Sequence, residues 1–305
     1  MGIRIEWIDP NGENADVKVY RSLTPMTEDN LPEPLTTVVG GVGFYVDNAV
    51  ARNQLYYYRL SSLGKAGSNE TIITPNKGMA YMPYTGPGPQ VLKRGDWECG
   101  YFGRLPMGDL IAQNELITFA GITAAEYAVT DNEWLKFVYK GKIFFIPKYP
   151  VCGTVSWETM YRAGCVYGDI PEAEWAPYAK TTYGVIPQKK QLTVGNHLFT
   201  VRHPTSRANP LSTSSANADL IGGEIDQFIA LAYRSRLYPD TAGRGQLDDV
   251  DYPNFVSFTT DLLTTGNCVN RGYGGQGGVD AVNVGLTNAG TNPVHGWRPL
   301  LVLTL

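Results

Sequence analysis

The sequence ends in NPVHGWRPLLVLTL, and five of its last six residues are apolar. A chain terminus is usually polar and loosely held. Leucine and valine side chains gain roughly 1.5–3 kcal/mol each when they leave water for a core. The segment therefore predicts a final strand that is buried in a sheet, in a domain whose fold is finished only by residues 300–305.

The first part of the chain alternates apolar and polar residues in the manner of β-strands. IRIEWID places Ile3, Ile5 and Trp7 on one face, and DVKVYRS places Val17 and Val19 on one face. The turn sequences DPNGEN and LGKAGSN separate such segments. Short strands at about ten-residue spacing are typical of an antiparallel sandwich, which we expect over residues 1–82.

A length of 305 residues favours two domains. The boundary is expected in MPYTGPGPQ, because a Gly-Pro-Gly-Pro sequence cannot continue a helix or an inner strand. Residues 83–90 are therefore predicted to be a linker, with the second domain over residues 91–305.

The second domain shows mixed patterns. LKFVYKGKIFFIP predicts a hairpin that turns at residues 140–142. VSWETMYRAG predicts a helix that begins after Ser156 and ends at Gly164, and GGEIDQFIALAYRS predicts a second helix. The expected fold class is mainly β with α+β: an N-terminal antiparallel sandwich, then a mixed domain with two short helices and long loops.

Composition narrows the function classes. The net charge is −4 and basic residues are scattered, which argues against a nucleic-acid partner. No apolar stretch reaches the length of a membrane span, and the N-terminus lacks the pattern of a signal peptide. Four cysteines without CxxC spacing are expected to be reduced and mostly buried, as in a protein made in a cytoplasm.

No catalytic, cofactor or metal motif emerges. GYGGQG matches the GxGxxG spacing of dinucleotide-binding sites, but no helical pattern follows it. We therefore expect a flexible loop here. Asp248, Asp249 and Asp251 could hold Ca²⁺, but they lack the closing Glu of an EF-hand, and a solvated loop is favoured. Glu224 and Asp226 point apart on a helix, which makes them a poor glycosidase pair.

The first domain resembles a fibronectin type III or related Ig-like module. Trp7 stands in an early strand, as in that family, and ADVKVYRS and FYVDNAVARNQLYYYRLSS supply Tyr20, Asp47, Tyr56 and Tyr58 at matching places. The resemblance implies a spacer or adhesive platform without catalytic chemistry.

The C-terminal segment NCVNRGYGGQGGVDAV…GWRPLLVL is similar to the end of the C-type-lectin/formylglycine-generating-enzyme superfamily, in a version seen in phage virion proteins. The resemblance implies a structural latch made by Arg271, Gly296, Trp297, Arg298 and Pro299. The oxidising enzymes of that superfamily carry two cysteines after the Arg-Gly segment. Here Cys268 precedes that segment and no cysteine follows it, so that chemistry is not expected.

What remains is a rigid frame that displays a long loop. Tyr, Asn and Gly are common in adaptable recognition surfaces. The candidate ligand-binding residues of the loop are Tyr273, Gln276, Asn283, Asn288 and Asn292. A subunit contact or a simple connecting loop are the alternatives for this segment.

Together these features predict a non-enzymatic bacteriophage virion protein, assembled in the host cytoplasm without a signal peptide. A tail-fibre or baseplate location is preferred, and capsid decoration or a head fibre is the alternative. The expected partners are other virion proteins, further copies of the chain and a host-surface glycan or protein, with no cofactor, nucleic acid or membrane insertion. A glycan-acting enzyme is the alternative of another class, and it would need two facing carboxylates.

Overall fold

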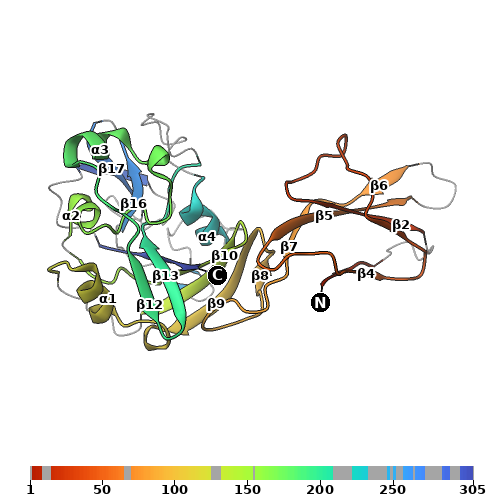
Figure 1. The fold of residues 1–305 in the computed structure, drawn as a ribbon, viewed down its shortest axis with the longest axis horizontal. Coiled ribbons are helices and arrows are strands. Elements are labelled where there is room, and N and C mark those ends of the chain that lie inside the picture. The colour runs from red at the N-terminus through yellow and green to blue at the C-terminus, as the bar shows by residue number, and fades with distance from the viewer. Residues whose placement is uncertain are drawn as a thin grey trace. The chain divides into compact units, whose positions relative to one another are not determined.

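The computed structural model describes residues 2–8, 15–64, 70–124, 132–153, 155–208, 222–232, 246–247, 250–251, 257–263, 265–271, 284–288 and 296–304. The chain divides into two compact units. The first unit comprises Met1–Thr85 together with two later segments, Gly95–Cys99 and Val138–Gly141, and the second unit comprises the remainder. The fold is mainly β, with several antiparallel sheets (Figure 1).

Two antiparallel sheets form the first unit. Its strands are β1 (Ile3–Glu6), β2 (Val17–Ser22), β3 (Thr36–Val38), β4 (Phe44–Asp47), β5 (Leu55–Leu63), β6 (Thr71–Ile73) and β7 (Lys77–Ala80). The smaller sheet pairs β1 with β4. The larger sheet has the order β3-β2-β5-β6, and β7 also pairs with β5.

The alternation of the sequence explains this core. Ile3 and Ile5 of β1 are buried and pack with Tyr56 and Tyr58 of β5, so the core lies between the two sheets. Side chains along a strand point to opposite faces in turn, and Tyr57 accordingly belongs to a different apolar cluster on the other face of β5. The predicted strand faces of β1 and β2 are confirmed.

The second unit is organised around a seven-stranded sheet with the order β12-β13-β19-β11-β10-β9-β8. Its strands are β8 (Arg94–Gly95), β9 (Cys99–Pro106), β10 (Glu133–Tyr139), β11 (Lys142–Pro147), β12 (Gln191–Val194), β13 (His197–Arg202) and β19 (Leu300–Thr304). A three-stranded sheet is made by β16 (Ser257–Leu262), β17 (Asn267–Arg271) and β18 (Val284–Asn288), and a two-stranded one by β14 (Gln246–Leu247) and β15 (Val250–Asp251).

The last strand lies inside the seven-stranded sheet. β19 pairs antiparallel with β13 on one side and with β11 on the other. Leu300 and Leu301 are completely buried. The expectation of a buried final strand is confirmed, and the hairpin of β10 and β11 is also observed, with Lys140 and Gly141 at positive φ in its two-residue turn.

The described residues contain more helices than the two that were expected. They are α1 (Gln113–Ala120), α2 (Trp157–Arg162), α3 (Pro177–Tyr183) and α4 (Glu224–Ala232). The two expected helices are α2, which Ser156 caps through the Thr159 N–H, and α4. The prediction missed α1 and α3, and neither of these helices has a side-chain hydrogen bond from its N-cap residue.

The second core joins α4 to the sheet. The Phe228 ring of α4 stacks on Phe137 of β10 at 4.6 Å between ring centroids, and it lies 5.6 Å from Phe144 of β11. Ile225 and Ala232, one turn to either side, are also buried. The helical spacing in this segment thus predicts the face that packs on the sheet.

The Gly-Pro segment, predicted to be a linker, makes hydrogen bonds with β10. Gly86–Arg94 belongs to the second unit. The ammonium of Lys136, a completely buried residue of β10, donates to the carbonyls of Gly86 at 3.3 Å, Pro87 at 2.9 Å and Pro89 at 2.7 Å. Because the segment is rich in proline and glycine, its carbonyls do not take part in strand pairing. The buried lysine donates hydrogen bonds to them instead.

Lys136 makes the stability of the second unit depend on pH. Burial lowers the pKa of Lys136 from 10.5 to about 7. Above pH 7 the unfolded chain therefore binds more protons at this site than the folded chain, and stability rises with pH by at most about 1.4 kcal/mol per unit. We expect Lys136→Met to abolish this part of the rise between pH 7 and 8, measured by urea unfolding. An unchanged slope would contradict the assignment.

Candidate functional site

The Gly-Trp-Arg-Pro sequence is held by the segment that follows β11. The Trp297 N–H donates to the Cys152 carbonyl at 2.9 Å, and the Val151 N–H donates to the Trp297 carbonyl at 2.8 Å. Trp297 is completely buried and Arg298 is 2% exposed. A Cβ on Gly296 would lie 2.5 Å from a carbon of the Pro150 ring, so this close approach requires glycine.

This latch places β19. Residues 150–152 follow β11 along the chain. The pairing of Cys152 with Trp297 therefore positions the start of β19 beside β11. Pro299 then precedes the first strand residue. The latch role of Gly296 and Trp297 stays a prediction, and it depends on these contacts.

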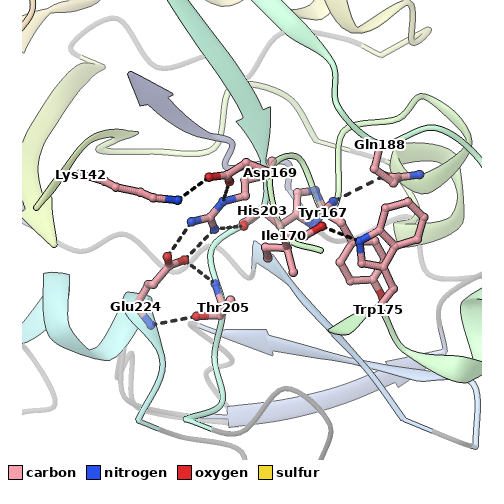
Figure 2. Close-up of polar contacts among 10 residues, drawn as sticks. Lys142, Tyr167, Asp169, Ile170, Trp175, Gln188, His203, Thr205 and Glu224 are labelled. Atoms are coloured by element: carbon pink, nitrogen blue, oxygen red, sulfur yellow. Dashed lines mark hydrogen bonds and ion pairs between the residues drawn. The ribbon is translucent and has the colours of Figure 1, made fainter. Parts of the chain in front are cut away.

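A second polar cluster surrounds Arg202, the last residue of β13. Its guanidinium binds Glu224 of α4 through two N–H···O contacts of 2.6 Å each. The Arg202 Nε donates to Asp169 at 3.1 Å, and Lys142 of β11 donates to the other Asp169 oxygen at 2.8 Å. Figure 2 shows Asp169 and Glu224 on two sides of this guanidinium.

Backbone groups complete the Arg202 cluster. Arg202 also donates to the His203 carbonyl at 2.9 Å. Glu224 accepts the Thr205 N–H at 3.1 Å, and the Thr205 hydroxyl accepts the Glu224 N–H at 3.0 Å, as Figure 2 shows at the start of α4. A Cβ on Gly168 would lie 2.7 Å from the Arg202 Cβ, so the chain passes closely over this side chain.

The charges in this cluster balance, with two cations facing two carboxylates. Burial alone would lower the pKa of Arg202, but Glu224 and Asp169 raise it above its usual value. Burial alone would raise the pKa of Asp169, but Arg202 and Lys142 hold it below 3.8. Asp169 and Glu224 are thus both committed to one guanidinium, which suits a fixed ion-pair network between β13 and α4.

Aromatic rings lie beside this network. Tyr167 stacks on Trp175 with ring centroids 5.1 Å apart and planes 7° apart, and Trp157 and Tyr161 stack at 5.4 Å. The Trp157 Nε1 donates to the Thr259 carbonyl at 2.9 Å, which joins α2 to β16. Figure 2 places Trp175 and Tyr167 next to Ile170, whose carbonyl accepts the Trp175 indole N–H.

Two buried groups titrate unusually in this region. Burial lowers the pKa of His203 to about 4, so the imidazole is neutral at physiological pH. Burial also raises the pKa of the Asp261 carboxyl above 3.8, although the Ser206 N–H donates to it at 2.7 Å. Both side chains are inside the unit, where such shifts accompany structural packing as well as catalysis.

The candidate loop falls mainly outside the described residues. Tyr273, Gln276, Asn283 and Asn292 all lie there. Asn288 is the last residue of β18, and Arg271 is the last residue of β17. Pairing within this sheet puts Asn288 opposite Asn267 and Arg271 opposite Val284, at opposite ends of the β17–β18 ladder.

The cysteines are separate, and none forms a disulfide. Burial raises the pKa of Cys152, Cys165 and Cys268 to about 12 each and that of Cys99 to about 11. A thiolate is the reactive form of cysteine, and these thiols remain protonated at neutral pH.

We therefore expect a thiol reagent such as a disulfide dye to label the native chain slowly at pH 7.5. In denaturant, all four thiols of the chain should react with the reagent. Rapid labelling of Cys152 or Cys165 in the native protein, located by peptide mapping, would contradict their burial.

The first unit has a groove of its own, with a volume of about 640 Å³. It is lined by residues of β1 and β7 and by Tyr58 and Leu60 of β5. Asp96 and Cys99, which belong to the same unit, also line it. The apolar/polar alternation of the sequence does not predict this groove. Alternation indicates which face of a strand is buried, but it does not indicate which strand edges lack a neighbour.

Sequence reasoning also missed the Arg202 cluster. Asp169 and Lys142 belong to segments that are distant along the chain, and only the sheet order brings them together. The one available signal was Glu224 at the start of a predicted helix, where a carboxylate is favourable.

In the described part of the chain, no group of three or more His, Cys, Asp or Glu side chains is arranged to hold a metal ion. Among the same residues, no helix is long and apolar enough to cross a membrane. Comparison with protein-family models, curated proteins and solved structures found no match.

Proposed function

We propose that the chain is a non-enzymatic structural protein of a bacteriophage virion. In this proposal the first unit is a fibronectin type III or Ig-like spacer, and the second is a C-type-lectin-like frame. The frame would carry the loop after Arg271 towards a host-surface glycan or a neighbouring virion protein. A tail-fibre or baseplate position is preferred to capsid decoration.

One observation carries the proposal: the Gly-Trp-Arg-Pro latch leads into β19, an inner strand of the seven-stranded sheet. The resemblance to the C-type-lectin superfamily implies such a final strand. The domain would then act as a frame that presents the segment between β17 and the latch. The two-sheet pairing of the first unit, with β1 on β4 and β2 between β3 and β5, supports the Ig-like assignment.

The Arg202 network also favours a scaffold over a glycan-acting enzyme. A glycosidase needs one carboxyl group able to donate a proton and a second that is ionised and faces the substrate. Asp169 and Glu224 converge on Arg202, which forms an ion pair with each of them.

The test is the composition of purified particles of the phage whose genome encodes the chain. Mass spectrometry should detect the chain at many copies per particle, and antibodies should label the tail under electron microscopy. Labelling of the head would favour capsid decoration instead. Absence from purified particles would overturn the proposal.

Host adhesion is tested separately with the labelled full chain and cells of the infected bacterium. A variant with Tyr273→Ala and Asn292→Ala should lose binding if the loop recognises the surface. Equal binding by this variant and by the unaltered chain would exclude these two residues as contacts.

A further inference from the structure

The groove of the first unit has the size and the apolar lining of a small-molecule site. Its volume of about 640 Å³ lies in the range that such sites occupy. Trp7, Leu60 and Met79 line it, and these side chains are only partly buried against the core cluster of Ile5 and Tyr58. An apolar ligand in the groove would therefore extend the core and remove these side chains from water.

Two polar side chains of the lining are already bonded to the backbone of the same unit. Asp96 accepts the Gly78 N–H at 2.9 Å and the Glu98 N–H at 2.8 Å. Asn76 accepts the Met26 N–H at 2.9 Å and donates to the Met26 carbonyl at 2.7 Å. A sugar needs several polar side chains for its hydroxyl groups, and these two are largely committed elsewhere.

Lys77 supplies a positive charge that the protein itself leaves available. It lies opposite Tyr58 in the pairing of β7 with β5, so both side chains are on the core-facing side of the sheet. Lys77 is exposed, and its ammonium has no hydrogen bond or ion pair with any part of the chain that the structure describes. Glu6, the other exposed charged residue of the lining, pairs with Arg4.

We propose that this groove binds a small amphipathic carboxylate of the fatty-acid type. Its apolar chain lies on Trp7, Leu60 and Met79, and its carboxylate pairs with the Lys77 ammonium. Charge complementarity selects the head group, because the carboxylates of the lining have partners and Lys77 has none in the described part of the chain. This binding activity belongs to the first unit and does not depend on the virion assignment.

Isothermal titration calorimetry of the full chain tests the site, with decanoate as the probe. Decanoate should bind saturably, and decylammonium, which has the same chain length and the opposite charge, should bind more weakly. Lys77→Met should weaken decanoate binding about fivefold, the value of one exposed ion pair. Lys77→Arg should preserve the binding, and Lys77→Glu should reverse the preference between the two probes. Lys18→Glu is the matched control, because Lys18 is an exposed lysine of β2 outside the groove lining.

The apolar lining is tested with Met79→Gln, which keeps the length of the side chain and adds an amide. This change should weaken decanoate binding, and the thermal unfolding of the variant should show that the first unit is folded. Lack of saturable decanoate binding, equal affinity for decylammonium, or equal affinity for glucuronate, an anionic sugar, would each overturn the proposal. None of these results affects the detection of the chain in particles, so the two proposals fail separately.

A free carboxylate and an acidic membrane lipid share the chemistry of an apolar chain with a negative head group. Flotation of the full chain with phosphatidylglycerol vesicles distinguishes the two sources. Flotation that Lys77→Glu abolishes would identify a lipid as the ligand. Decanoate binding without flotation would identify a free carboxylate.

Discussion

Removal of residues 300–305 is expected to leave the second unit unfolded. β19 holds a position between β13 and β11, so its loss removes both ladders and separates the sheet into two parts. It also removes four residues that are no more than 5% exposed: Leu300, Leu301, Val302 and Leu303. At roughly 1.5–3 kcal/mol per buried side chain, the loss is of the order of the whole stability of a domain.

The truncated chain should lose one cooperative transition in thermal unfolding, and limited proteolysis should still leave a fragment from the first unit. The point variant Val302→Asp should reproduce the loss because Val302 is 4% exposed. Thr304→Asp, on the exposed end of the same strand, should melt almost as the unaltered chain does. A soluble truncation with both transitions intact would disprove the central role of β19.

Arg202→Met is expected to destabilise the second unit by about 3–5 kcal/mol, because it leaves the Glu224 and Asp169 carboxylates without their buried partner. The Arg202→Met/Glu224→Met chain should recover part of that loss, since an apolar pair avoids the uncompensated charge. Arg162→Met is the matched control. Its ion pair with Glu158 is exposed, so a change within about 0.5 kcal/mol is expected.

The pH dependence of these chains should differ in sign. In the unaltered protein the pKa of Asp169 is held below its usual value, so its contribution is present at neutral pH and is lost as the pH falls below about 4. Without Arg202, burial, which is the largest influence on the Asp169 carboxyl, would raise the pKa of Asp169, and protonation in acid would stabilise the folded state. The difference in free energy of unfolding between the Arg202→Met chain and the unaltered protein, measured with urea, should therefore be smaller at pH 5 than at pH 8. A larger difference at pH 5 would contradict this account.

Local patterns predicted those elements whose cause is local. The alternation in β1 and β2, the turn between β10 and β11, the Ser156 cap and the apolar face of α4 each depend on neighbours within a few residues. The burial of β19 was also predictable, because a dense apolar run has few alternatives to a core.

Long-range features were not predictable in the same way. In the sequence, Lys136 is a charged residue within an apolar strand, and its role is not evident. The structure shows that it donates to the carbonyls of Gly86, Pro87 and Pro89. Arg202 acquires its partners from β11, from the loop holding Asp169 and from α4, which no spacing relates. The pairing of β1 with β4 alone among the described strands likewise depends on how many strands each sheet has, and the pattern of a single strand carries no such information.

The position of β19 also constrains how the chain folds during synthesis. The strands β9 to β13 leave the ribosome long before residue 304, yet β11 and β13 become neighbours of a common strand only when β19 arrives. Until then their apolar edges have no partner, a state in which nascent chains bind chaperones or one another. The seven strands described in residues 1–85 are complete by Ala80, so this part of the first unit can begin folding early. Slowing translation should therefore benefit the first unit more than the second, in which β19 pairs with residues about a hundred positions or more away along the chain.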